Sequence, residues 1–160
     1  LEKKVAADVY GCRFFGVMDR VDSIIPGTVR LVDYKSGADS QKVLDVNDDN
    51  AEKIVSRIFD DSYSYRKDYK AALQFHIYDR MAQASGIASS GEQLCNTMYS
   101  ASELFRKVPQ VNLMNEDFAE LMDVRLQGIM DDIHDQSVPF RRTEDERNCE
   151  YCDFKTICGR

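Results

Sequence analysis

The fold of this chain is decided by the stretch Gly16-Val-Met-Asp-Arg-Val-Asp22, then a Pro26-Gly27 pair, then Val29-Arg-Leu-Val-Asp-Tyr-Lys-Ser-Gly37. Proline followed by glycine is typical of a tight turn, and apolar residues lie on both sides of it. The pattern predicts a β-hairpin in which one strand ends near Asp19 and the next delivers Asp33. A carboxylate at the end of a buried apolar strand is unfavourable unless it is paired or binds a metal.

Three charged side chains are expected to meet at this edge of the sheet. Side chains alternate between the two faces of a strand, so Asp33 and Lys35 point the same way and Tyr34 points away. With Asp19 they form a set of two carboxylates and an ammonium. Carboxylates bind a hard cation such as Mg²⁺, and a lysine can position or activate a water. The set indicates a metal-dependent hydrolase, although an Asp-x-Lys pattern alone is also common on solvated surfaces.

A helix is expected downstream, because apolar residues recur at helical spacing around Gln74 and Tyr78. These two residues are four apart and therefore neighbours on one face of that helix. His76 lies between them in the sequence but is rotated about 160° away from Tyr78, so we expect a structural role for it. Gln and Tyr at this spacing are common by themselves; their position roughly forty residues after the hairpin makes the pair informative.

The cysteines are concentrated near the end of the chain. Cys149, Cys152 and Cys158 form a C-x₂-C-x₅-C pattern, in which a short loop can bring three thiolates to one metal ion or cluster. The tight spacing argues against a disulfide framework. Cys12 and Cys95 are expected to pack as small buried hydrophobic residues.

These patterns together resemble the PD-(D/E)XK nuclease superfamily. The resemblance rests on G-x-x-D-R-x-D, a hairpin turn, V-D-Y-K-S-G, and a Q-x-x-x-Y helix, and it extends from about Tyr10 to Cys158. Within the superfamily, the motifs look most like the RecB/AddB-type nuclease domains of helicase–nuclease complexes and the related CRISPR-adaptation nucleases.

The resemblance implies a role for each matched residue of the hairpin. Asp19 and Asp33, with the backbone carbonyl of Tyr34, would bind Mg²⁺ or Mn²⁺, and Lys35 would be catalytic. Asp22 matches a non-catalytic family position, for which a structural hydrogen bond is expected.

The helix and the cysteine tail receive roles in the same way. Gln74 and Tyr78 would contact a DNA phosphate or orient the metal ligands. In this branch the cysteine triplet, here within residues 149–158, holds a [4Fe–4S] cluster with a fourth cysteine from well upstream. Because the chain has no obvious equivalent, we expect that ligand to lie outside it; a plain zinc site is the alternative.

The same resemblance implies the extent of the domain. Residues 1–160 are expected to form one nuclease domain, the C-terminal part of a longer protein, and residues 149–158 are its cysteine-rich tail. The family places a helix, which often carries a further metal ligand, before the first strand, and this chain begins after that point.

The predicted fold class is α/β, a restriction-endonuclease-like domain with a mixed central sheet flanked by helices. Its 160 residues are enough to bury a substantial core. Asn115 is a plausible helix cap, with acidic residues in the turn that follows it. The strands are expected at about Val9–Met18, Thr28–Tyr34 and Gln93–Ser100, and the helices at about Ala51–Phe59, Arg66–Ala84 and Asn115–His134.

The net charge of −7 argues against DNA binding by the whole surface and leaves local contacts as the alternative. Basic residues cluster at Arg66-Lys67-Lys70, Arg106-Lys107 and Arg141-Arg142, where solvated surface charge is an equal explanation. No run approaches the roughly twenty apolar residues of a membrane span.

The function predicted from the sequence is a Mg²⁺-dependent deoxyribonuclease. It would act on DNA in helicase-linked recombination or repair in the cytoplasm. The alternative is a catalytically inactive nuclease-fold domain that binds DNA or serves as a scaffold.

Overall fold

The computed structural model describes residues 2–36, 44–60, 69–103, 105–106, 108–139 and 141–160. The predicted mixed sheet is confirmed: its strand order is β3-β4-β5-β6, with β4 and β5 parallel and the other two pairs antiparallel. The parallel pair places the carboxyl ends of both central strands at one edge of the sheet. The strands are β3 (Arg20–Asp22), β4 (Thr28–Lys35), β5 (Gln93–Ser100) and β6 (Asn112–Leu113).

A separate hairpin of β1 (Lys3–Val9) and β2 (Cys12–Met18) precedes this sheet. The expected single strand from Val9 to Met18 is therefore wrong at its start, because Tyr10 and Gly11 form a turn with φ of 52° and 70°. Positive φ at both central residues suits the right-handed twist of a two-residue hairpin, but tyrosine rarely adopts it.

The partner of β4 also differs from the prediction. The strand that ends just before Asp19 is β2, and it pairs with β1 rather than with β4. A bend at Asp19 separates β2 from the three-residue strand β3, which pairs with β4 across the predicted Pro26-Gly27 turn. The hairpin that carries Asp33 is consequently shorter than expected.

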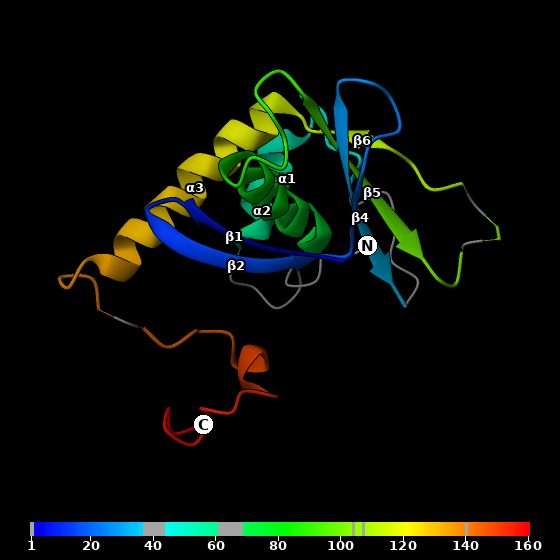
Figure 1. Cartoon of the computed structure of the whole chain (residues 1–160). Coiled ribbons are helices and arrows are strands. Elements are labelled where there is room, and N and C mark those ends of the chain that lie inside the picture. Colours follow the sequence, from blue (N-terminus) through cyan, green and yellow to red (C-terminus); the bar gives the residue numbers. More distant parts are fainter. Residues whose placement is uncertain (1, 37–43, 61–68, 104, 107, 140) are drawn as a thin grey trace.

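Within the described part of the chain, three α-helices accompany the strands (Figure 1). All three occur where predicted, although residues 66–68 at the expected start of the second lie outside the described residues. The predicted cap is confirmed, because Asn115 Oδ1 accepts a hydrogen bond from the Phe118 amide at 2.8 Å. The helices are α1 (Ala51–Ile58), α2 (Lys70–Ala84) and α3 (Glu116–His134).

Helix α2 lies between two apolar cores, with the strands on one side and the other helices on the opposite side (Figure 1). In the first core, Phe75 and Met81 pack with side chains of β1, β4 and β5. In the second, Ala72 packs with side chains of α1 and α3. This burial on two sides fixes the position of α2 relative to the end of β4.

Residues 141–160 follow α3 as turns and one short 3₁₀ helix, η3 (Glu146–Cys149). This segment, which contains the cysteine-rich tail, lies apart from the strands (Figure 1). Among the described residues, no helix has both the length and the apolar character needed to cross a membrane.

Two buried ionisable groups on α2 act on the stability of the fold. Burial raises the pKa of Asp79 to about 7, against a hydrogen bond that its Oδ2 accepts from Asn96 Nδ2 at 3.0 Å. Burial, with Arg80 nearby, lowers the pKa of His76 to about 4. A raised carboxyl pKa means that stability falls as the pH rises from about 4 to about 7. A lowered histidine pKa means that stability grows from about pH 4 to about pH 6.5, so the two effects oppose each other.

The substitution Asp79→Asn should remove the decrease in stability that the raised pKa of Asp79 causes as the pH rises. Relative to the parent chain, the variant's free energy of unfolding should increase between about pH 4 and about pH 7, by about 4 kcal/mol over the whole range. Urea denaturation at several pH values measures this difference. Asp132→Asn, the same change at an exposed position of α3, is the control and should shift little. A pH-independent difference for Asp79→Asn would contradict the prediction.

Candidate active site

Strand β4 ends in the predicted Asp33-Tyr34-Lys35 triplet. Its residues from Val29 to Asp33 are buried, and the Asp33 carboxylate is only 7% exposed. Lys35 Nζ lies 2.9 Å from Asp33 Oδ2, so the two side chains share one face of the strand as predicted. The Lys35 ammonium therefore offsets part of the unfavourable burial of this carboxylate.

Helix α2 brings the predicted Gln74 and Tyr78 to the same place. Gln74 Oε1 accepts a hydrogen bond from Lys35 Nζ at 3.0 Å, and Gln74 Nε2 donates to Asp33 Oδ1 at 2.8 Å. The Gln74 amide also donates to the Tyr78 hydroxyl at 3.1 Å. The Tyr78 hydroxyl in turn donates to the Val17 carbonyl of β2 at 2.9 Å. Asp33, Lys35 and Gln74 thus form a closed ring of contacts that Tyr78 anchors to the hairpin.

Asp19 lies beside this ring, at the bend between β2 and β3. Its Oδ2 accepts a hydrogen bond from the Tyr34 amide at 2.8 Å. Continuing the β3–β4 register by one residue places Asp19 opposite Asp33. Strand β2 passes close to α2 near this bend: a Cβ added at Gly16 would lie 3.3 Å from the Met81 side chain.

The structure therefore brings together all five predicted side chains of the site, Asp19, Asp33, Lys35, Gln74 and Tyr78. The expected structural role of Asp22 is also observed. Its two carboxylate oxygens each accept a hydrogen bond from Arg30 at 2.8 Å. These hydrogen bonds are the main cause that lowers the pKa of Asp22.

The oxygen ligands at the end of β4 suit a hard divalent cation. Asp33 Oδ2 is buried and accepts no hydrogen bond, although it contacts the Lys35 ammonium. In the described residues, no three His, Cys, Asp or Glu side chains gather around one point. Two carboxylates are nevertheless enough for Mg²⁺, which is commonly held by one or two carboxylates with waters and substrate phosphates.

The cysteine tail is described in full but is not gathered around a common centre. Cys149, Cys152 and Cys158 are free thiols, and no metal-binding group of three such side chains is found in the described part of the chain. Cys95 is buried in β5, as predicted. Cys12 is not: it is half-buried, and its Sγ lies 3.9 Å from His134 Nε2.

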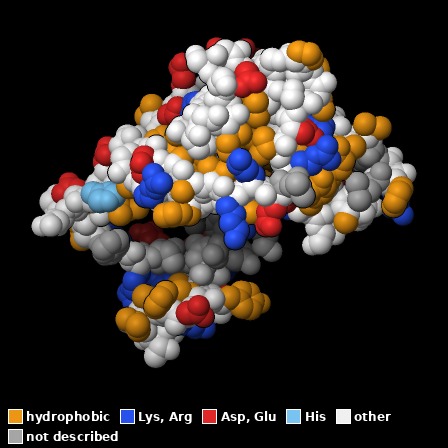
Figure 2. Space-filling model, in the orientation of Figure 1, with side chains coloured by type: hydrophobic (Ala, Val, Ile, Leu, Met, Phe, Trp, Pro, Cys, Tyr) orange, Lys and Arg blue, Asp and Glu red, His pale blue; other side chains and the backbone are white. Residues whose placement is uncertain are grey.

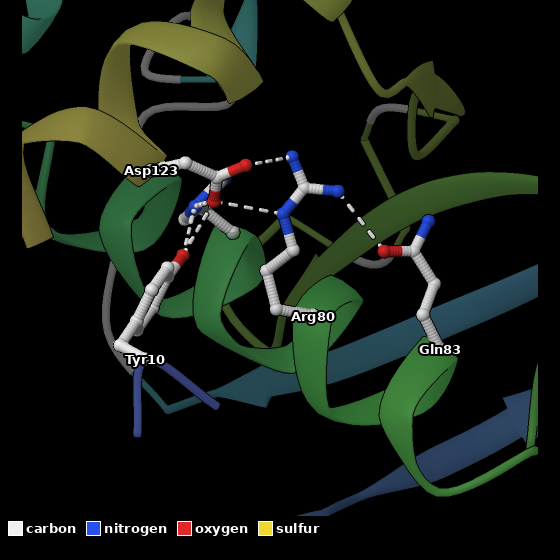
Figure 3. Close-up of polar contacts among 5 residues, drawn as sticks. Tyr10, Arg80, Gln83 and Asp123 are labelled. Carbon is white, nitrogen blue, oxygen red and sulfur yellow. Dashed lines mark hydrogen bonds and ion pairs between the residues drawn. The ribbon is translucent and has the colours of Figure 1, made fainter. Parts of the chain in front are cut away.

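A second polar cluster joins α2 to α3 and to the turn between β1 and β2 (Figure 3). The Asp123 carboxylate of α3 accepts hydrogen bonds from the Tyr10 hydroxyl at 2.6 Å and from Arg80 Nη2 at 2.6 Å. His76 Nε2 lies 3.1 Å from the same carboxylate, which confirms that this histidine is structural. Burial opposes ionisation of Asp123, but its hydrogen bonds from Arg80 and Tyr10 outweigh this and lower its pKa.

This cluster ties the β1–β2 turn and α3 to the back of α2. It thereby holds the helix that presents Gln74 and Tyr78, and it stabilises Tyr10 in its unfavourable left-handed conformation. No local sequence pattern indicates this cluster, because Tyr10, Arg80 and Asp123 lie far apart in the chain.

The displayed surface carries intermixed positive, negative and hydrophobic side chains rather than a field of one sign (Figure 2). Of the predicted basic clusters, residues 66, 67 and 107 lie outside the described residues. Arg142 donates a hydrogen bond to the Cys158 carbonyl at 2.8 Å and so serves the cysteine tail.

The comparisons with known proteins agree with this geometry at the level of the family. No curated protein matches the chain. One solved structure, the crystal structure of SSO0001, is similar over 99% of this chain with 18% identity and a TM-score of 0.34. The chain spans 57% of the length of that protein. The family model of the PD-(D/E)XK nuclease superfamily matches residues 1–159. The chain therefore belongs to the PD-(D/E)XK nuclease superfamily.

Proposed function

We propose that this domain is a metal-dependent deoxyribonuclease that hydrolyses phosphodiester bonds in DNA. The observation that carries the proposal is the ring of contacts among Asp33, Lys35 and Gln74, with Asp19 beside it. Membership of a nuclease superfamily supports the same activity. A buried carboxylate paired with a lysine at a strand end is unfavourable for stability alone, which favours a functional role.

Asp19, Asp33 and the Tyr34 carbonyl are the proposed ligands of Mg²⁺ or Mn²⁺. Such an ion, when bound, polarises a phosphate oxygen and makes a bound water more acidic. The Lys35 ammonium, held by Asp33 and Gln74, would position the attacking water and stabilise the charge that develops on the phosphate. Gln74 would orient Asp33 and Lys35 at once, because its amide donates to the first and accepts from the second.

Loss of either charged group of the ring should abolish most of the cleavage. We expect Asp33→Ala and Lys35→Ala each to lower the rate of cleavage of linear DNA with Mg²⁺ or Mn²⁺ by about 10²- to 10⁴-fold. Asp132→Ala and Lys53→Ala, matched changes at exposed positions of α3 and α1, should retain the parent rate. Gel analysis of a labelled duplex and of its single strand measures the rates.

Two results would contradict this assignment. Equal cleavage by the parent and by both ring variants would remove Asp33 and Lys35 from the mechanism. Absence of cleavage by every protein, in a sample shown to be folded by circular dichroism, would favour the alternative of an inactive nuclease-fold domain that binds DNA or serves as a scaffold.

The role of Gln74 as a positioning residue can be separated from catalysis. Gln74→Leu should lower activity by about 10- to 100-fold and raise the Mg²⁺ concentration needed for half-maximal rate, because Asp33 loses its orienting hydrogen bond. Gln127→Leu, the same change at an exposed position of α3, is the matched control. An unchanged metal dependence in Gln74→Leu would show that the amide does not orient the metal ligands.

We further propose that Cys149, Cys152 and Cys158 bind a [4Fe–4S] cluster with a fourth cysteine from outside this chain. The short loops between them allow one cluster to be enclosed, and all three are free thiols. Anaerobic purification of the protein should give a brown sample with iron and sulfide, and Cys152→Ser should lose both. Cys95→Ser is the control. A colourless sample loaded with zinc would support a plain zinc site instead.

The proposal extends to the process in which the domain acts. The hairpin, the Q-x-x-x-Y helix and the cysteine tail all resemble RecB/AddB-type domains. We therefore propose that the domain works beside a helicase domain or subunit in DNA recombination or repair. A cytoplasmic location suits thiolates that bind metal, because such ligands need a reducing compartment.

A further inference from the structure

Two tyrosine rings lie on the face of β4 and β5 opposite to Asp33. Tyr34 and Tyr99 are direct partners in the parallel register, and their ring centroids are 5.5 Å apart with a 35° angle between the ring planes. They belong to the other face because side chains alternate along a strand and Asp33 immediately precedes Tyr34. We call this pair the tyrosine platform.

The exposure of the tyrosine platform is unusual for its strand. The five β4 residues from Val29 to Asp33 are buried, whereas Tyr34 is 50% exposed. A cross-strand aromatic pair also stabilises a sheet, but that role alone does not require half of a ring to face solvent. A large aromatic surface at a strand end is therefore available to a ligand.

Positive charge accompanies the rings. A hydrogen bond with Tyr34 and the nearby Asp22 carboxylate raise the pKa of the Arg20 guanidinium. Asp22 also accepts hydrogen bonds from Arg30, so two guanidinium groups share this carboxylate near the rings. An anionic ligand with a flat apolar surface would match this combination.

The tyrosine platform is joined directly to the candidate active site. Tyr34 lies between Asp33 and Lys35 in the chain, and its amide is bound by Asp19. A nucleotide stacked on Tyr34 would thus lie at the same strand end as the proposed position of the scissile phosphate, but on the other face of the sheet. Arg20, which follows Asp19, could contact the adjoining phosphate.

We propose that the tyrosine platform stacks an unpaired base of the DNA substrate. Only an unpaired, unstacked base has a free face for the ring, and stacking on an aromatic side chain is tolerant of sequence. The inference deepens the proposed nuclease function and rests on it for the identity of the substrate.

Binding can be measured separately from cleavage. We would use fluorescence anisotropy in the presence of EDTA, with a labelled oligothymidylate and an oligonucleotide of equal length and charge made of abasic residues. The proteins are the parent chain, Tyr99→Ala and Tyr99→Phe, because Tyr99 is not among the proposed metal ligands. Tyr151→Ala, at an exposed tyrosine of the cysteine-rich tail, is the control.

The parent chain should bind the oligothymidylate about 5- to 100-fold more tightly than the abasic strand. Tyr99→Ala should lower the affinity for the oligothymidylate by a similar factor and should change the affinity for the abasic strand little. Tyr99→Phe, which keeps the ring, should bind as the parent does. Equal affinity of the parent for the two oligonucleotides, or no measurable binding of either, would overturn the proposal.

A destabilised Tyr99→Ala variant would not obscure the result. Circular dichroism and the melting temperature report its folding, and a base preference that persists in a folded Tyr99→Ala protein would also overturn the proposal. Base-dependent binding without metal-dependent cleavage would refute the nuclease proposal and retain the tyrosine platform. Cleavage that depends on Asp33, together with base-independent binding, would support the nuclease proposal and refute the role of the tyrosine platform.

Discussion

The burial of the Asp33 carboxylate at the end of β4 is the constraint on which the arrangement of this domain depends. A carboxylate that is 7% exposed needs partners, and the structure supplies Lys35 from the same strand and Gln74 from α2. Because the Gln74 amide both donates and accepts in this ring, the position of α2 relative to β4 is specified closely. The same contacts that satisfy the buried charge therefore assemble the proposed catalytic residues.

Helix α2 connects the two halves of the molecule. One face presents Gln74 and Tyr78 to the strand end, and the opposite face is bound through Arg80 to Asp123 of α3. Apolar cores on both sides hold the helix between the strands and the other two helices. Interiors packed in this way resist small displacements, so the helix holds Gln74 and Tyr78 in place at the strand end. Stability and the proposed catalysis are thus coupled through one element.

Several features of the site could be predicted because they depend on local patterns. Strand alternation placed Asp33 and Lys35 together, and helical spacing placed Gln74 beside Tyr78. The β1–β2 turn was missed because tyrosine at positive φ carries no local signal; its hydroxyl is held by Asp123, far away in the chain. The partner of β4 was misassigned because nothing local indicates the bend at Asp19 that separates β2 from β3.

The sequence by itself determined the three described helices, strands β4 and β5, and the set of polar residues at the candidate site, because periodicity, caps and motif spacing act over a few residues. Only the tertiary structure decided which elements meet. It showed that one amide bridges Asp33 and Lys35, that a second polar cluster fixes the back of α2, and that Tyr34 and Tyr99 form an exposed pair. These contacts join residues distant in the chain, and their geometry follows from packing that no local pattern encodes.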